Sequence, residues 1–322
     1  MRYIVIGAGP AGVVAVETLR AQDPNGEIML IGGEPEPAYS RMAIPYLLTN
    51  QIDEAGTYLR HDADHFRNLA VQQIQQRVTS IDPETDSLSL ADGSSLSYDR
   101  LLIASGSRPV SPPIEGLDQP GVHHCWTLED ARNIMRYAEH GSPVVLMGAG
   151  FIGCIIMEAL VARGVDLTVV EMGDRMVPRM MDQTAGNLIK QWCIDKGVQV
   201  HTSTRVLSVK PDSQSDTRLL LQCQPEAELH ADLIIVATGV KPDTGFLTHS
   251  GIEIGQGIIV DEHLRTSVPN IYAAGDVCEG FDWSTGSRAL NAIQPIAVET
   301  GRVAALNMTC LLYTSPSPRD KF

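Results

Sequence analysis

Two glycine-rich segments have the residue types and spacing that suit dinucleotide binding. Each places three glycines in the pattern G-x-G-x-x-G after a short apolar run and before a helical stretch. The first glycine permits a tight turn, the second lets backbone N–H groups approach a pyrophosphate, and the third allows close helix–strand packing. The helix N-terminus adds free N–H donors and the positive end of its dipole. The two candidate segments contain Gly7, Gly9, Pro10, Ala11 and Gly12, and Gly148, Gly150, Phe151, Ile152 and Gly153.

An acidic residue follows each segment at a useful distance. Glu34 lies 22 residues after Gly12, and Glu171 lies 18 residues after Gly153. A carboxylate at this point accepts hydrogen bonds from ribose hydroxyls, and at the second site it repels the 2′-phosphate of NADP. The sequence therefore favours NADH over NADPH, although Arg175 and Arg179 lie close enough in sequence to bind a phosphate.

The elements that must position these residues occur twice. A buried strand, the glycine turn, a helix and a second buried strand recur 141 residues later. Two copies of one unit indicate two nucleotide-binding domains of like topology. The predicted elements are a strand at 2–6, a helix to about Gln22 and a strand at 28–31, and their repeats at 144–147, to about Arg163, and at 167–170.

The remaining segments are expected to complete these domains. We expect hairpins near 81–98 and 206–221, buried strands at 101–103, 233–236 and 271–274, and a helix at 295–308. The proline-rich segment 108–120 is interpreted as a linker. Residues 311–322 continue no recognisable element, and we expect an aberrant, disordered tail there.

Composition excludes several classes of function. The 322 residues have a formal net charge of −15, which disfavours binding to nucleic acid and to anionic membranes. No apolar run approaches the roughly 18 residues of a membrane span, and no secretory signal is recognised. The six cysteines are scattered singly, which is typical of a reducing cytoplasm, and we expect no metal site.

Five stretches together resemble the FAD-dependent pyridine nucleotide-disulfide oxidoreductase family, over about residues 1–310. They occur in the order of the family and are highly specific in combination. These stretches are 7–12, 104–109, 148–153, 237–242 and 266–276.

The resemblance implies that the first glycine segment binds FAD and the second binds NAD(P)H. It implies that the strand ends at 104–106 and 237–239 pack near the two nucleotides, and that Asp276 holds the ribityl and pyrophosphate region of FAD. The N-terminus of the helix at 295 would face the flavin pyrimidine, where its dipole stabilises reduced flavin. Arg41 lies in a segment similar to the flavin-contacting one of rubredoxin and ferredoxin reductases. The further candidate residues are thus Arg41, Ser105, Gly106, Thr238, Gly239, Gly275, Asp276, Gln294, Pro295 and Ile296.

The sequence departs from the family pattern at three points. Met42 stands where thiol-dependent members have cysteine, and a thioether forms neither a thiolate nor a disulfide. Ile155 replaces a glutamate found near the nicotinamide in many relatives; Glu158 is a possible substitute, but Glu17 occupies the same repeat position, which favours a shared structural role. Full-length relatives are commonly dimers, and we expect this chain to lack their C-terminal interface domain.

We therefore predict an α/β fold with two Rossmann-like, three-layer β/β/α domains, the NAD domain being inserted in the FAD domain. The expected boundaries are 1–112 and 243–310 for FAD and 113–242 for NAD(P)H. The predicted function is transfer of a hydride from NADH to flavin and of electrons to an external acceptor. That acceptor is a ferredoxin- or rubredoxin-type protein, a nitrite reductase module, a quinone or oxygen. The alternatives are a thiol-linked NADH oxidase or CoA-disulfide reductase, and a flavin- and NAD-binding sensor without turnover.

Overall fold

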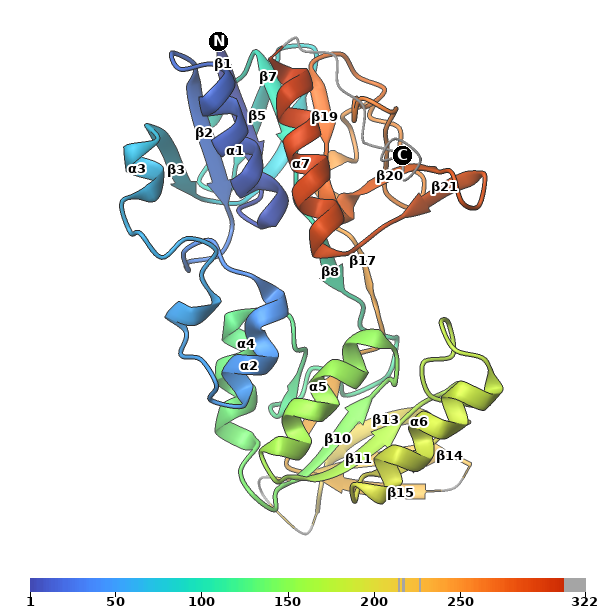
Figure 1. Cartoon of the computed structure of the whole chain (residues 1–322). Helices are drawn as coiled ribbons and strands as arrows, with labels where there is room; N and C mark the ends of the chain where they lie inside the picture. The colour runs from blue at the N-terminus through green and yellow to red at the C-terminus, as the bar shows by residue number, and fades with distance from the viewer. Residues whose placement is uncertain (214, 216–217, 226, 310–322) are drawn as a thin grey trace, which may run out of the picture. The chain divides into compact units, whose positions relative to one another are not determined.

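Each glycine-rich segment begins at the carboxyl end of the central strand of a five-stranded parallel sheet (Figure 1). The computed structural model describes residues 1–213, 215, 218–225 and 227–309. The first sheet has the order β19-β7-β1-β2-β3 and consists of β1 (Arg2–Ile6), β2 (Glu27–Gly32), β3 (Val71–Gln75), β7 (Arg100–Ile103) and β19 (Ile271–Ala273).

The second sheet repeats this order strand for strand. It runs β12-β11-β10-β16-β9, and all its neighbours are parallel. The duplication that the sequence predicts is therefore present in the topology. The strands are β9 (Val122–His123), β10 (Pro143–Met147), β11 (Asp166–Val170), β12 (Gln199–His201) and β16 (Leu233–Val236).

Helices α1 (Pro10–Gln22) and α7 (Gln294–Met308) lie side by side on the first sheet (Figure 1). Their approach is very close, because a Cβ added at Gly301 would lie 2.3 Å from the carbonyl oxygen of Ala11. The central strands are apolar and buried on both faces, as expected for a covered parallel sheet. Both helices end where the sequence predicts.

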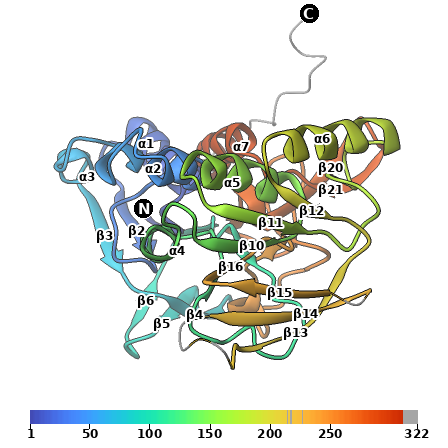
Figure 2. The same ribbon diagram turned by 90° about the horizontal axis from the view of Figure 1, so that it is seen from below.

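A small antiparallel sheet forms the third layer in each half. Figure 2 shows α5 (Phe151–Ala162) and α6 (Gln183–Asp195) on one side of β10 and β11, with the antiparallel strands on the other. We expected hairpins at these two places, but each is a three-stranded meander, since a third short strand pairs on. The strands are β4 (Val78–Asp82), β5 (Ser87–Leu90) and β6 (Ser95–Ser97), and β13 (Arg205–Pro211), β14 (Leu219–Gln224) and β15 (Ala227–Ala231).

The chain forms two compact units, each interrupted in sequence. Unit 1 comprises 1–40, 58–108 and the chain from 241 onwards, and unit 2 comprises 41–57 and 109–240. The expected boundaries differ from these chiefly at 41–57, which we expected in the first domain. That segment contains η1 (Arg41–Ala43), α2 (Ile44–Leu48) and η2 (Ala55–Thr57), and α2 packs against α5 and α4 (Leu128–Tyr137).

The expected linker at 108–120 begins as a strand. Its first residues belong to β8 (Ser107–Pro109), which pairs with β17 (Val240–Pro242). The predicted tail, 311–322, lies outside the described residues. No helix in the described part of the chain is long and apolar enough to cross a membrane. The other elements are α3 (His65–Asn68), η3 (Gly245–Leu247), β18 (Ile258–Ile259), η4 (Gly275–Val277), β20 (Cys278–Asp282) and β21 (Ser287–Leu290).

Candidate dinucleotide sites

The two glycine turns have the same local construction. Gly7 and Gly148 adopt φ values of +110° and +102°, which only glycine tolerates readily. Each also lies against the neighbouring strand end, so that an added Cβ would lie 2.1 Å from the oxygen of Ala104 or 2.6 Å from that of Ala237. Both the backbone conformation and the available space therefore require glycine at the first position of each motif.

The second and third glycines of each motif have opposite surroundings. A Cβ at Gly12 would lie 1.9 Å from the Gly7 oxygen, and one at Gly153 would lie 2.3 Å from the Gly148 oxygen. At Gly9 and Gly150, by contrast, an added Cβ would meet no described atom within 4 Å. The third glycine is thus needed for packing, whereas the second leaves space beside the backbone that a bound group can enter.

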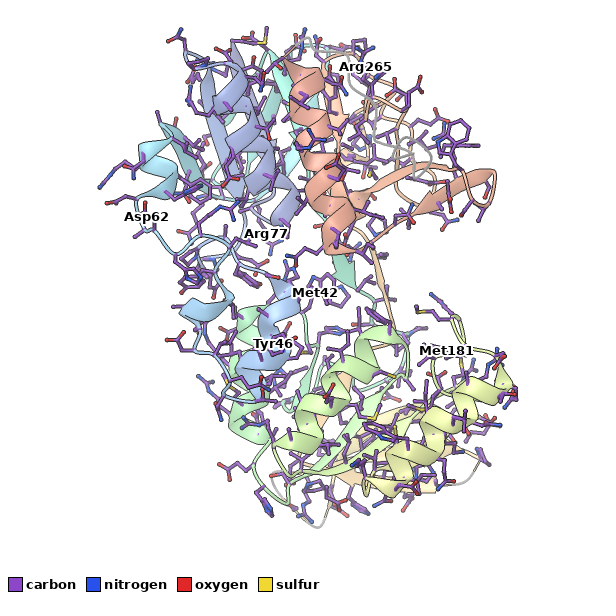
Figure 3. All side chains as sticks on the ribbon, in the orientation of Figure 1. Met42, Tyr46, Asp62, Arg77, Met181 and Arg265 are labelled. Atoms are coloured by element: carbon purple, nitrogen blue, oxygen red, sulfur yellow. The ribbon has the colours of Figure 1, made fainter. Side chains whose placement is uncertain are left out.

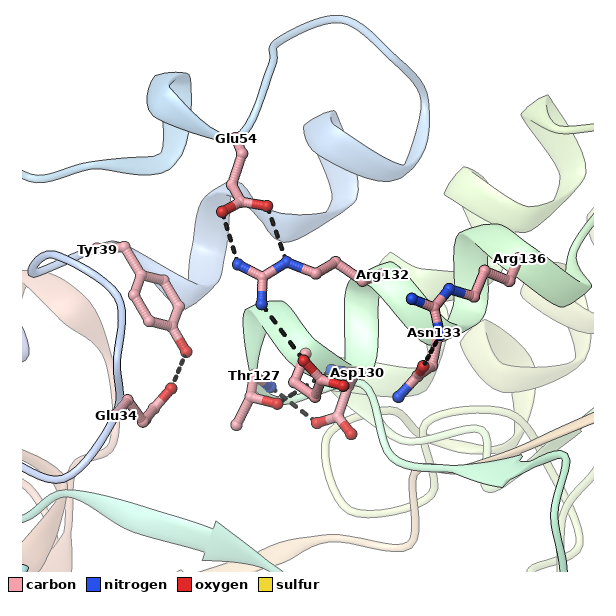
Figure 4. Close-up of polar contacts among 9 residues, drawn as sticks. Glu34, Tyr39, Glu54, Thr127, Asp130, Arg132, Asn133 and Arg136 are labelled. Carbon is pink, nitrogen blue, oxygen red and sulfur yellow. Dashed lines mark hydrogen bonds and ion pairs between the residues drawn. The ribbon is translucent and has the colours of Figure 1, made fainter.

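The N-termini of the longer helices fall into two classes. Side chains cap α4, where Thr127 and Asp130 form a reciprocal capping box (Figure 4), and α6, where the Asp182 carboxylate accepts from Ala185 N. No described side chain caps α1, α5 or α7. These three are the helices that the sequence assigns to FAD, NAD(P)H and the flavin ring. Their first-turn N–H groups are therefore not occupied by a capping side chain and suit an anionic ligand.

The acidic residues lie at the ends of the second strands but already have partners. The Glu34 carboxylate accepts a hydrogen bond from the Tyr39 hydroxyl (Figure 4). Glu171 accepts from Ala149 N at 2.7 Å and from Gly173 N at 2.6 Å, which fixes its carboxylate beside the glycine turn. A carboxylate has about four lone-pair sites, so both residues retain acceptor capacity for ribose hydroxyls.

Arg175 is held within its own loop. Its guanidinium donates to the oxygens of Met181 and Pro178 at 2.9 and 3.1 Å, and pairs with Asp174 at 2.7 Å. Arg179 is exposed. Of the two arginines that could favour NADPH, Arg175 is thus used structurally.

The strand-end residues are tied to the chain segments that pass between the units. Ser105 Oγ donates to the Asp243 oxygen, and Thr238 Oγ1 donates to the Val110 oxygen, each at 2.8 Å. The following glycines, Gly106 and Gly239, also adopt positive φ. These hydrogen bonds fix the backbone next to each glycine turn.

The other candidates of unit 1 are held by partners that sequence reasoning missed. Ser107 Oγ donates to Asp276 at 3.2 Å, and Gly275 N donates to Thr300 Oγ1 at 3.0 Å, which joins α7 to the turn at Asp276. Ser40 Oγ donates to Gln294 Oε1 at 2.7 Å. Each contact joins residues far apart in sequence, so no local pattern could have indicated it. Pro295 is exposed and Ile296 half-buried in the first turn of α7.

Arg41 belongs to unit 2. Its guanidinium donates to the Trp126 oxygen at 2.6 Å and lies 5.1 Å from the centre of the indole ring. Its neighbours Met42 and Tyr46 are about half exposed, and Figure 3 shows them on η1 and α2. A contact of Arg41 with FAD stays a prediction.

Glu17 and Glu158 have different surroundings despite their matching repeat positions. Glu17 pairs with Arg60 at 2.6 Å and with His65 at 2.7 Å, whereas Glu158 is exposed on α5. The expectation of one shared structural role is therefore wrong, because the residues that pair with Glu17 come from a segment specific to unit 1.

The described thiols are poorly suited to nucleophilic chemistry. Burial raises the pKa of Cys125 and Cys278 to about 12, and burial together with nearby negative charge raises that of Cys154 to about 11. Reactive cysteines have a lowered pKa instead. In the described part of the chain, no three His, Cys, Asp or Glu side chains are grouped so as to hold a metal ion.

Comparisons with known proteins agree with this geometry. Residues 1–295 match the pyridine nucleotide-disulphide oxidoreductase family. The chain is 33% identical to the NADH-dependent phenylglyoxylate dehydrogenase subunit epsilon of Aromatoleum evansii, over 95% of this chain and 72% of that protein. It is also 33% identical to the NADH oxidase of Methanocaldococcus jannaschii, over 96% of this chain and 70% of that protein.

Among solved structures, the fold is similar to that of the reductase in a covalent putidaredoxin reductase–putidaredoxin complex. The TM-score is 0.92 and the identity 25%, over 98% of this chain and 76% of that chain. The predicted α/β architecture and the use of FAD and NADH are confirmed by these relationships. The chain therefore belongs to the pyridine nucleotide-disulphide oxidoreductase family and is an FAD-dependent NAD(P)H oxidoreductase.

Proposed function

We propose that this protein takes electrons from NADH and delivers them to a separate redox protein, with FAD held in unit 1 and NADH in unit 2. The observation that supports this most directly is the set of uncapped helices: α1, α5 and α7 lack a capping side chain among the described residues, whereas α4 and α6 have one. When bound, FAD accepts an electron pair from NADH and passes electrons to an acceptor.

The residues of unit 1 would bind and orient FAD. The open space beside Gly9 and the first-turn N–H groups of α1 fit its pyrophosphate, and Glu34 fits its ribose. Asp276, held by Ser107, would accept from the ribityl hydroxyls. The N-terminus of α7, with Gln294 fixed by Ser40, would place donors against the flavin pyrimidine, where negative charge develops on reduction.

The residues of unit 2 would bind NADH in the equivalent way. Gly150 leaves space beside the N-terminus of α5, and Glu171 lies beside the same turn. A 2′-phosphate would approach the Glu171 carboxylate, and the Arg175 guanidinium is used within its own loop. We therefore propose NADH rather than NADPH as the donor.

The acceptor is proposed to be a small iron–sulfur or rubredoxin-type protein. Support comes from the structural relative that is joined to putidaredoxin, a separate protein. Met42 at the position of the redox cysteine of thiol-dependent members also favours direct transfer from the flavin. The net charge of −15 disfavours a strongly acidic acceptor.

The test is anaerobic mixing of the FAD-loaded protein with NADH or NADPH, while the visible flavin absorbance is followed. We expect NADH to bleach the flavin with an apparent affinity at least about tenfold better than that of NADPH, and Glu171→Gln to remove most of this preference. Bleaching by neither nucleotide would contradict the proposal. Bleaching without reoxidation by any tested acceptor would favour a sensor instead.

The thiol-linked alternative is tested by alkylation. Because burial raises the pKa of the described thiols, we expect N-ethylmaleimide to leave NADH oxidation with ferricyanide unchanged. Loss of turnover that parallels modification of one cysteine would support the thiol-linked mechanism, and Cys125, next to Trp126, would then be the first residue to replace.

A further inference from the structure

Three sulfur atoms in unit 2 come from neighbouring positions on α5 and α6. The Cys193 thiol lies 3.5 Å from the Met157 thioether sulfur, and both side chains are almost fully buried. Cys154 lies three residues before Met157 on α5 and therefore shares its face of the helix. We call Cys154, Met157 and Cys193 the sulfur cluster.

The two thiols of the cluster are within electrostatic reach of each other. Burial is the main cause of the raised pKa of Cys154, and the charge of Cys193 and then of Glu171 raises it further. The Glu171 carboxylate is itself fixed by the N–H groups of Ala149 and Gly173, which leaves the sulfurs as the soft donors at this place. Cys154 is only partly buried and offers an entry path from solvent.

We propose that the sulfur cluster is a binding site for a soft monovalent cation, with Cu(I) as the fitting ion. Thiolate and thioether donors select Cu(I), whereas Mg²⁺ and Ca²⁺ prefer oxygen ligands. In binding, Cys154 and Cys193 form two thiolate–copper bonds and Met157 adds its thioether sulfur. The two thiol protons pass to solvent, and no electron is transferred. The two thiolates and Cu(I) together leave one negative charge on the site.

The site has a consequence for the dinucleotide that rests on the proposed function. Cys154 directly follows Gly153, whose close packing holds the first turn of α5 against the glycine turn. Copper bonded to Cys154 would move this turn, so we expect Cu(I) to weaken NADH binding. NADH would weaken Cu(I) binding by the same factor, because coupling between two sites is reciprocal.

The direct test is anaerobic competition for Cu(I) between the FAD-loaded protein, without NADH, and a colorimetric Cu(I) chelator. We expect the protein to retain one equivalent of Cu(I). Cys154→Ala and Cys193→Ala should each lower the affinity at least about 100-fold, since even residues that only support a metal ligand change affinity by about 10- to 100-fold. Cys223→Ala is the matched control, because this buried thiol of the same unit lies in β14 away from the cluster.

Met157→Leu keeps the side-chain volume and guards against a loss of binding that only reflects misfolding. We expect it to fold and to bind Cu(I) about tenfold more weakly, with X-ray absorption showing three sulfur neighbours in the wild type and two in this variant. Retention of wild-type affinity in both cysteine variants, or equal loss in Cys223→Ala, would overturn the proposal. So would failure of the wild type to retain copper. None of these readouts uses NADH, so a failure of the proposed function would be distinguishable.

Discussion

Gly9 and Gly12 lie three positions apart in one motif, yet the structure uses them for different purposes. Gly12 has no room for a side chain because the Gly7 oxygen lies where its Cβ would stand. Gly9 has room, and its φ of −78° and ψ of −175° suit any residue. The sequence motif alone does not separate a packing glycine from a ligand-binding one, whereas the space around each residue does.

This difference predicts opposite results for two alanine substitutions. Gly12→Ala should lower the free energy of unfolding by about 3 kcal/mol or more, because backbone must move to admit the methyl group. Gly9→Ala should change it by less than about 0.5 kcal/mol but weaken FAD binding at least about tenfold, because the methyl group enters the proposed pyrophosphate space. Urea unfolding of the FAD-free protein and flavin-fluorescence titration measure the two effects. Unchanged FAD affinity in Gly9→Ala would contradict the proposed placement.

At the scale of elements, the clearest surprise is the segment 41–57, which packs in unit 2 although its sequence neighbours lie in unit 1. Two arginines anchor it. Arg132 forms a bidentate pair with Glu54 at 2.6 and 3.0 Å (Figure 4), and Arg163 donates to the Leu48 oxygen at the end of α2 at 2.7 Å. Arg163 also donates to the oxygens of Ala138 and Met135, so one guanidinium joins α2, α4 and α5.

Arg163→Met should therefore loosen α2 locally. Removing three hydrogen bonds is expected to cost about 1–2 kcal/mol, because water replaces part of each bond. Hydrogen exchange should become faster at 44–48 while the central strands of unit 2 keep their protection. Arg136→Met is the matched control on α4, since the only described partner of Arg136 is Asn133 of the same helix at 3.4 Å (Figure 4). Equal effects of the two substitutions would count against the anchoring role.

At the scale of the whole molecule, the two halves share a sheet order but differ in how charge is used. Burial alone would raise the pKa of Glu17, but the hydrogen bond and charge of Arg60, together with those of His65, outweigh it and hold the pKa below its usual value. Glu158, its counterpart in the repeat, is exposed. A carboxylate with a lowered pKa adds stability above its unfolded pKa, about 4.3, and loses this contribution as the pH falls through the folded pKa.

Glu17→Gln should accordingly lower stability at pH 7 by about 1–2 kcal/mol, the range for hydrogen bonds to charged groups. The difference from the wild type should shrink below about pH 4, where the wild-type carboxyl also becomes neutral. Glu158→Gln should stay within about 0.5 kcal/mol at every pH. Urea unfolding followed by circular dichroism across this pH range checks both variants, and a pH-independent effect of Glu17→Gln would argue against the ion pair.

Much of this molecule follows from local sequence. The β-branched runs, the glycine turns and the lengths of α1, α5 and α7 are consequences of short-range propensity and spacing, and the repeat of these signals predicts two like sheets. The meanders were only partly predicted, because their third strands are short and polar and gain stability chiefly by pairing. The strand β8 in a proline-rich segment was missed for the same reason.

By itself the sequence determined the two nucleotide-binding units, their glycine turns and the class of cofactor, because each depends on residues close together in the chain. Only the tertiary structure decided that 41–57 packs in unit 2, that Thr300 and Ser40 hold the turn at Asp276 and the start of α7, and that the sulfurs of α5 and α6 meet. These contacts join residues that are distant in sequence. Their partners are chosen by packing and hydrogen bonding in the folded state, which no local pattern records.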